Sequence, residues 1–270
     1  MTKRLKNNMS NHKILTIDNL SLQEYDSEAE LIPLLTPEDE EEMINEELPD
    51  SLPILPLRNM VLFPGVVIPI TAGRDKSIKL INDANAAGKI IGVVAQKDES
   101  DEDPTKEDIH TIGTVARILR VLKMPDGNTT VILQGKKRFE IDTVTSEDPY
   151  LTASIKDFPE NRPDKTDTEF LAILESIKEL AIQIIKESPN IPTEATFAIK
   201  NIESQSFLIN FVTSNMNLSV KEKQDLLAIN DLKERALETL RYMNIELQKL
   251  ELKNDIQSKV RFDLDQQQRE

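Results

Sequence analysis

The feature that most constrains the fold of this chain is the apolar stretch from Leu52 to Ile70, which four prolines interrupt. A proline inside a helix removes a backbone donor and clashes with the preceding turn, so no continuous helix runs through this stretch. Prolines in extended chain lie on edge strands or at strand ends. The sequence therefore predicts two short strands folded over a tight turn, in which Pro64 fixes one φ angle and Gly65 takes a positive φ.

The side chains around this turn have two interpretations. Phe63, Pro64, Val66 and Val67 belong either to the core of a β-rich domain or to an apolar surface that is left exposed for a partner. The sequence alone leaves both interpretations open.

The pattern after this stretch predicts a β-rich domain over residues 51–158. Arg74 and Asp75 can cap a short helix whose apolar residues recur at helical spacing as far as Gly88. Apolar or alternating runs predict strands at 90–95, 111–123, 129–134 and 150–158. The basic cluster Lys136–Arg138 is expected to be a solvated strand edge.

A linker with two prolines is expected at 159–167, and beyond it the apolar residues recur at intervals of three and four, which predicts helices. A helical bundle is expected over 168–230, and its last helix begins with a capping box from Ser219 to Glu222. A final helix is expected over 231–270, with its first half packed on the bundle and its second half projecting. No residue pattern stops this helix, so we expect the chain to continue. The predicted fold class is α+β.

Composition disfavours several classes of function. The chain has no cysteine and only two histidines, so it offers no disulfide framework, no thiolate metal site and no imidazole cluster. It has no glycine-rich phosphate loop, and no nucleophile stands beside an evident base, so we expect neither a cofactor nor catalysis in these residues. No stretch approaches the length of a membrane span and no targeting segment is evident, which favours the cytoplasm.

Charge divides the chain into two unequal parts. Residues 1–50 contain 13 acidic and 4 basic side chains, so they hold −9 of the net charge of −15. This segment has no apolar periodicity and is expected to be a disordered acidic extension. The remaining −6 lies on the part that folds, which disfavours a nucleic-acid partner.

Three blocks of sequence resemble the N-terminal region of the Lon family of ATP-dependent proteases: Leu52–Ile78, Val93–Lys97 and Ile112–Gly127. The resemblance covers about Leu52 to Glu270. It implies a PUA-like Lon head with one short helix, then an all-α subdomain and a long helix that leads toward an ATPase module. It also implies that the full-length protein is a hexameric serine endopeptidase with a Ser-Lys dyad that uses ATP and magnesium. Both of these active sites would follow Glu270.

The resemblance favours the recognition and tethering of unfolded or damaged proteins, as part of protein quality control under stress. The expected substrate contacts are two turns, with Phe63, Pro64, Val66 and Val67 in the first and Arg74, Asp75 and Lys76 in the second. The first turn is ranked higher because it is apolar. A stand-alone binding module and a PUA-like RNA-binding domain are the alternatives. Taken alone, residues 1–270 are expected to be monomeric or weakly associating.

Overall fold

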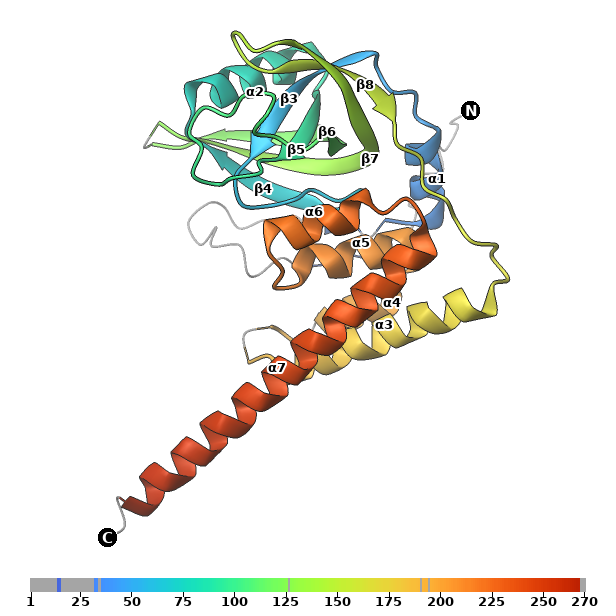
Figure 1. Cartoon of the computed structure of the whole chain (residues 1–270), viewed down its shortest axis with the longest axis vertical. Coiled ribbons are helices and arrows are strands. Elements are labelled where there is room, and N and C mark those ends of the chain that lie inside the picture. Colours follow the sequence, from blue (N-terminus) through green and yellow to red (C-terminus); the bar gives the residue numbers. More distant parts are fainter. Residues whose placement is uncertain are drawn as a thin grey trace, which may run out of the picture.

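The computed structural model describes residues 14–15, 32–33, 35–125, 127–189, 191–193 and 195–267. A β-rich head sits on a group of helices, and one long helix projects away from both (Figure 1). The predicted α+β class and the order of strands before helices are confirmed. The division of the chain into separate domains stays a prediction.

The head contains β3 (Ser51–Leu57), β4 (Val67–Ala72), α2 (Asp75–Ala87), β5 (Ile90–Ala95), β6 (Ile112–Lys123), β7 (Thr129–Ser146) and β8 (Thr152–Asp157). Its strand order is β4-β7-β6-β5-β3-β8, and β7 also pairs with β8. The pairing of β7 with β8 therefore closes the sheet into a small barrel. Strand β4 lies outside this barrel and pairs with the first half of β7. Strands β3 and β5 are parallel, and the other pairs are antiparallel.

The first two strands of the head exist as predicted, but they do not form a hairpin. β3 pairs with β5 and β8, whereas β4 pairs only with β7 among the described strands. The chain between them does turn at Gly65, whose φ of +80° confirms the expected glycine position. The hairpin interpretation is wrong because the partners that satisfy these strands lie much later in the sequence, where local patterning gives no pairing information.

Elsewhere in the head, helix α2 and the β6–β7 hairpin form as predicted, but Arg74 stands at the N-cap position of α2 without a side-chain capping hydrogen bond. Helix α2 is followed by Gly88, whose φ is +149°, and it buries Leu80 and Ile81 against the sheet. Strands β6 and β7 form the expected hairpin, but β7 continues past its expected end as one long strand.

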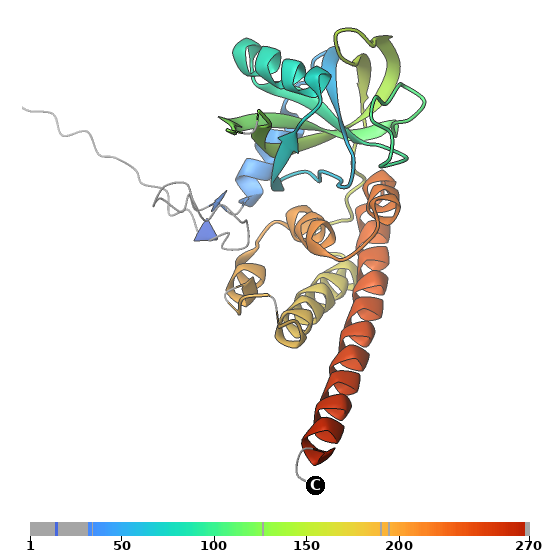
Figure 2. The same ribbon diagram turned by 90° about the vertical axis from the view of Figure 1, so that its left-hand side faces the viewer.

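The helical half contains α3 (Thr168–Glu187), α4 (Ala195–Asn201), α5 (Gln205–Asn215), α6 (Val220–Ala228) and α7 (Leu232–Gln267). The predicted capping box at Ser219 and Glu222 is present at the start of α6. Figure 2 shows α3, α4 and α5 on one side of α7. The first half of α7 buries Ala236 and Met243, while Leu252 and Phe262 in its second half are more than half exposed, so the predicted projecting helix is confirmed.

Parts of the acidic extension form regular secondary structure. Residues 14–15 and 32–33 form a two-stranded pair, β1 (Ile14–Leu15) and β2 (Ile32–Pro33), and Pro37–Asn45 forms helix α1. The expectation of disorder is therefore wrong for these segments, and the rest of residues 1–34 lies outside the described residues. Thr36 and Asp39 form a capping box, and acidic residues in a first helical turn interact favourably with the helix dipole. The glutamate run thus favours a helix here.

Candidate functional site

The first predicted contact turn is mostly buried. Phe63 is fully buried, Val66 is 6% exposed, and Pro64 and Val67 are half-buried. The side chain of Asn210 on α5 donates a hydrogen bond to the carbonyl oxygen of Pro64 at 3.1 Å. The interpretation of this turn as an exposed apolar surface is therefore wrong for Phe63 and Val66, because the helical half covers them.

The second predicted turn, at the start of α2, lies at the surface. Arg74 donates from Nη2 to Gln96 Oε1 at 2.6 Å and to the carbonyl oxygen of Asp101 at 3.1 Å. Partial burial, and then the nearby Arg58, lower the pKa of Arg74. Lys76 pairs with Asp103 at 2.8 Å, and Asp75 is exposed. The structure does not bring the two predicted turns together into one site.

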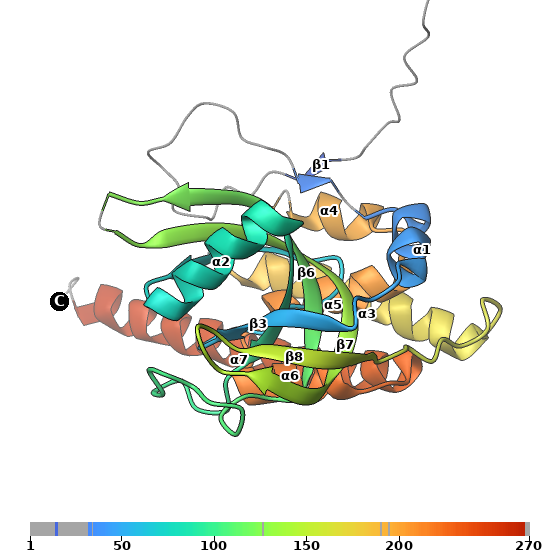
Figure 3. The same cartoon turned by 90° about the horizontal axis from the view of Figure 1, so that it is seen from above.

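The start of α2 opens onto a hollow surface that we call the furrow. One wall of the furrow is α2, the other is the segment 147–152, and β3 lies between α2 and β8 in the view of Figure 3. A pocket of about 110 Å³ lies at one end, lined by Ile54, Pro56, Arg74, Lys76, Ser77, Leu80, Asp103, Pro104, Thr105, Glu147, Tyr150 and Leu151. A larger groove of about 750 Å³ lies at the other end, lined by 46–49, 51–53, Asp83, Ala84, Ala87, Gly88, Ile90, Val115, Lys136, Lys137, Tyr150 and Thr152.

Tyr150 separates the pocket from the groove. Its hydroxyl donates to Asp83 Oδ2 on α2 at 3.3 Å, and it lines both hollows. Burial, and then the charge of Asp83, raise the pKa of Tyr150. Leu48 is half-buried at the groove and packs against the residues inside the barrel. The groove is thus mainly apolar, with charged side chains of both signs at its rim. Such a lining suits a ligand with an uncharged, apolar middle and polar groups at its ends.

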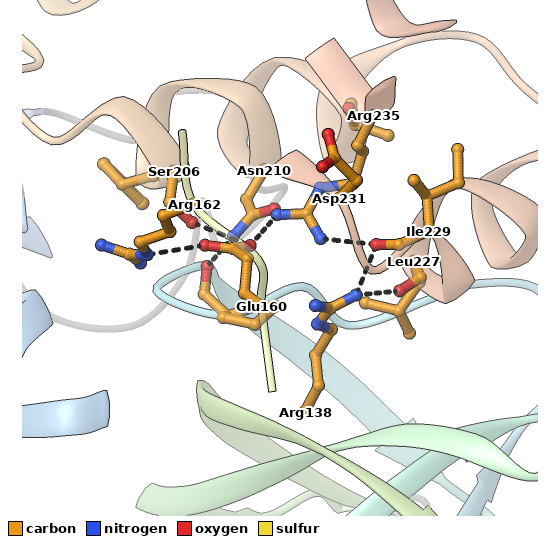
Figure 4. A network of polar contacts seen from close by, with 12 residues as sticks. Arg138, Glu160, Arg162, Ser206, Asn210, Leu227, Ile229, Asp231 and Arg235 are labelled. Atoms are coloured by element: carbon orange, nitrogen blue, oxygen red, sulfur yellow. Dashed lines mark hydrogen bonds and ion pairs between the residues drawn. The ribbon is translucent and has the colours of Figure 1, made fainter. Parts of the chain in front are cut away.

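The head meets the helical half at a buried polar junction (Figure 4). Arg138 on β7 is 3% exposed and donates from Nη1 to the carbonyl oxygens of Leu227 and Ile229 at 2.8 and 2.7 Å. Burial, and then repulsion by Arg235, lower its pKa to about 10. The prediction that Lys136–Arg138 is a solvated strand edge is therefore wrong for Arg138, because the end of α6 covers this part of β7.

Glu160 is the central acceptor of the junction. It accepts hydrogen bonds from Arg162 Nε at 3.0 Å, from Arg235 on α7 and from Ser206 Oγ at 3.4 Å. Burial alone would raise the pKa of Glu160, but Arg235, Arg162 and Arg138 outweigh burial, and the pKa lies below its ordinary value. The carboxylate is therefore held in its charged form among three guanidinium groups.

The first half of the expected linker is part of this junction. The backbone N–H of Asn161 donates to the carbonyl oxygen of Asn230 at 3.0 Å, and the N–H of Leu232 donates to the carbonyl oxygen of Asn161 at 2.9 Å. Together with the ion pairs of Glu160, these bonds join the linker to the start of α7. The head and α7 are thus connected directly.

The N-terminal helix α1 also reaches the junction. Glu40 is 8% exposed and accepts hydrogen bonds from Arg162 and from the hydroxyl of Ser204, the N-cap residue of α5. Leu35 and Met43 are buried in the same cluster as Phe63. Local patterning does not predict the bonds of Glu40, because they join residues more than a hundred positions apart.

The described residues hold neither a metal-binding cluster nor a helix suited to cross a membrane. No group of three or more histidine, cysteine or carboxylate residues there is placed to hold a metal ion. In that same part of the chain, none of the helices combines the length and apolar character that crossing a bilayer requires.

Comparison with known proteins assigns this architecture to one family. The sequence model described as the ATP-dependent protease La (LON) substrate-binding domain matches residues 51–244. The chain belongs to this family of Lon substrate-binding domains. The match begins where β3 begins and ends within α7, so it includes the head, the junction and the helical bundle.

Curated relatives agree with this assignment. The chain is 87% identical over 262 residues to a Lon protease of Flavobacterium johnsoniae, covering 97% of this chain and 32% of that protein. It is 49% identical over 241 residues to a Lon protease of Cytophaga hutchinsonii, covering 89% of this chain and 30% of that protein. The chain thus spans about a third of the length of these relatives.

A solved structure supports the fold. The N-terminal domain of a Lon protease from the Mycobacterium avium complex superposes with a TM-score of 0.60 at 20% identity, over 72% of this chain and 98% of that one.

Proposed function

We propose that this region binds extended apolar segments of unfolded or damaged proteins on behalf of a Lon-type ATP-dependent protease. The observation that carries the proposal is the match of residues 51–244 to a domain described as substrate-binding. The furrow supports it, because its larger groove of about 750 Å³ lies within the size range of sites that take a ligand into a concave apolar surface.

The physical size of such a contact indicates weak binding by one copy. Burying about 200 Å² of apolar surface stabilises a complex by about 5 kcal/mol before association costs are subtracted. We propose that several copies act together in a hexamer, since linked sites raise the effective concentration of a bound polypeptide. In this proposal the second half of α7 sets the spacing between the head and the parts of the protease that follow.

The proposal for the whole protein goes further than this chain. It includes a serine endopeptidase with a Ser-Lys dyad, ATP and magnesium in a separate motor, and action in the cytoplasm during quality control and stress. The support is the name shared by the curated relatives, which are Lon proteases.

A direct binding experiment tests the proposed function. The chain is titrated with fluorescein-labelled casein, a polypeptide without a fixed fold, and with folded lysozyme as the comparison. We expect saturable binding of casein and none of lysozyme. Absence of casein binding by the chain would contradict the proposal.

Matched variants test whether the furrow is the site. Ala87 lines the groove, whereas Ala86 is exposed on the same helix and does not line it. Ala87→Asp should weaken casein binding, since it puts a charge into an apolar groove, while Ala86→Asp should not. Arg74→Glu should weaken it more than Lys200→Glu, an equal charge reversal on α4. Equal binding within both pairs would place the site elsewhere on the chain.

A further inference from the structure

One short helix joins the junction to the furrow. Glu40 lies in the middle of α1 and is held at the junction by Arg162 and Ser204. Helix α1 ends at Asn45, and the residues that follow it, 46–49, form a third wall at the groove, called the wall below. At about 1.5 Å per helical residue, Glu40 and the start of this wall are roughly 9 Å apart along the helix. A shift of α1 at one end must therefore move the chain at the other.

At its far end the wall is held by the head, where the backbone N–H of Ile155 donates to the carbonyl oxygen of Asp50 at 3.2 Å, but along its own length its contacts are weaker. Glu46 approaches Lys136 at 3.9 Å, and the Glu46 side chain is 46% exposed, so this long ion pair contributes little. Leu48 packs on the residues inside the barrel but is only half-buried. Glu40, by contrast, is buried with two partners, and loss of a buried charged partner is costly. The position of the wall thus depends on how firmly α1 is held at the junction.

We propose that α1 is a strap that couples the furrow to the junction. Glu40 is its anchor, and the strap keeps the wall at 46–49 in the position that an extended polypeptide contacts. This inference rests on the proposed function, because it takes the furrow as the site. Coupling is reciprocal, so occupation of the furrow must also strengthen the docking of α1 at the junction.

Binding is the first test of the strap. Casein affinity is compared for the parent, Glu40→Gln and the matched control Glu42→Gln, which removes the same charge from an exposed position of α1. If the wall occupies its binding position in only a fraction of the molecules, the apparent affinity is lowered in proportion to that fraction. We expect Glu40→Gln to bind roughly fivefold more weakly, at the lower end of typical coupling, and Glu42→Gln to bind like the parent.

Hydrogen exchange is the second test, and it separates coupling from simple loss of structure. In the parent, saturating casein should slow exchange of the backbone amides from Met43 to Leu48. In Glu40→Gln these amides should exchange faster, and casein should protect them less. If Glu40→Gln proves poorly folded, Arg162→Gln removes the same contact from a partly exposed partner and should give the same two results.

The outcomes distinguish the two proposals. Parent-like casein binding by Glu40→Gln together with faster exchange of α1 overturns the strap and leaves the proposed function standing. Tighter binding by Glu40→Gln also overturns it, since α1 would then be a lid that competes with the polypeptide. No casein binding by the parent overturns the proposed function, and the strap with it.

Discussion

The junction and the furrow, two regions of the head, differ in what fills them. At the junction, helices α5 and α6 cover the apolar turn around Phe63, and Arg138 is satisfied by carbonyl oxygens from the end of α6. At the furrow, a groove of about 750 Å³ stays open between α2 and the residues next to Tyr150. An apolar surface that the chain covers itself stabilises the fold, whereas one that is left open is available to a partner. We therefore expect the first region to contribute mainly to stability, and the proposed function places binding at the second.

The largest expected effect is on the junction. Phe63→Ala should lower the free energy of unfolding by about 3–5 kcal/mol, because the ring is fully buried in the cluster shared with the helical half. Phe197→Ala is the matched control, since that ring is 67% exposed, and it should change stability by less than about 0.5 kcal/mol. Urea unfolding of both variants measures the difference. Similar values for the two would mean that Phe63 is not covered as described.

A second large effect concerns the charged groups of the junction. Arg235→Ala leaves Glu160 buried without one of its guanidinium partners and should cost about 3–5 kcal/mol. Arg241→Ala, on the same helix, removes an exposed ion pair with Glu238 and should cost less than about 1 kcal/mol. Thermal and urea unfolding of the two variants measure these losses of stability. A small loss for Arg235→Ala would show that the junction contributes little to stability.

These effects also mark what the sequence could and could not reveal. Local patterning located α2, the β6–β7 hairpin and the helical half, because apolar period and cap residues are properties of neighbouring positions. It did not reveal that α5 covers Phe63, or that Arg138 ends beneath α6, because these contacts join segments far apart in the chain. A buried arginine and a solvated one look the same in sequence.

The candidate site was predictable to a similar extent. Arg74 and Lys76 were expected as substrate contacts from their position at the start of a short helix, and both line the small pocket. Leu48 was not expected, since it belongs to the segment interpreted as disordered, and Tyr150 was seen only as the start of a strand. A groove is formed by several segments at once, so no single stretch of sequence identifies it.

A smaller effect tests how closely α5 packs on the turn at the junction. A Cβ atom at Gly65 would lie 2.7 Å from a ring carbon of Phe207, whereas one at Gly127 in the β6–β7 hairpin would meet no atom within 4 Å. Both glycines have positive φ, so alanine strains either backbone by about 1–2 kcal/mol. Gly65→Ala should therefore cost about 1 kcal/mol more than Gly127→Ala in urea unfolding, because Phe207 must also move. Equal losses would indicate that α5 can retreat freely.

The smallest expected effect is on the pH dependence of stability, and it tests the charge state of the junction alone. The pKa of Glu160 in the folded chain lies below its ordinary value of 4.5, so the unfolded chain takes up the proton more readily. The stabilisation by this carboxylate is therefore fully present above about pH 4.5 and is lost as the pH falls through the lower, folded value.

The variant Glu160→Gln has no such carboxylate to protonate, so its free energy of unfolding should fall less steeply on acidification than that of the parent. Carboxylates that share no partner with Glu160 cancel in the comparison, and the difference between the two curves reports Glu160 together with Glu40, which also pairs with Arg162. Parallel curves would mean that Glu160 is not held charged by its arginine neighbours, and the polar junction would then resemble the exposed ion pairs on the rest of the surface.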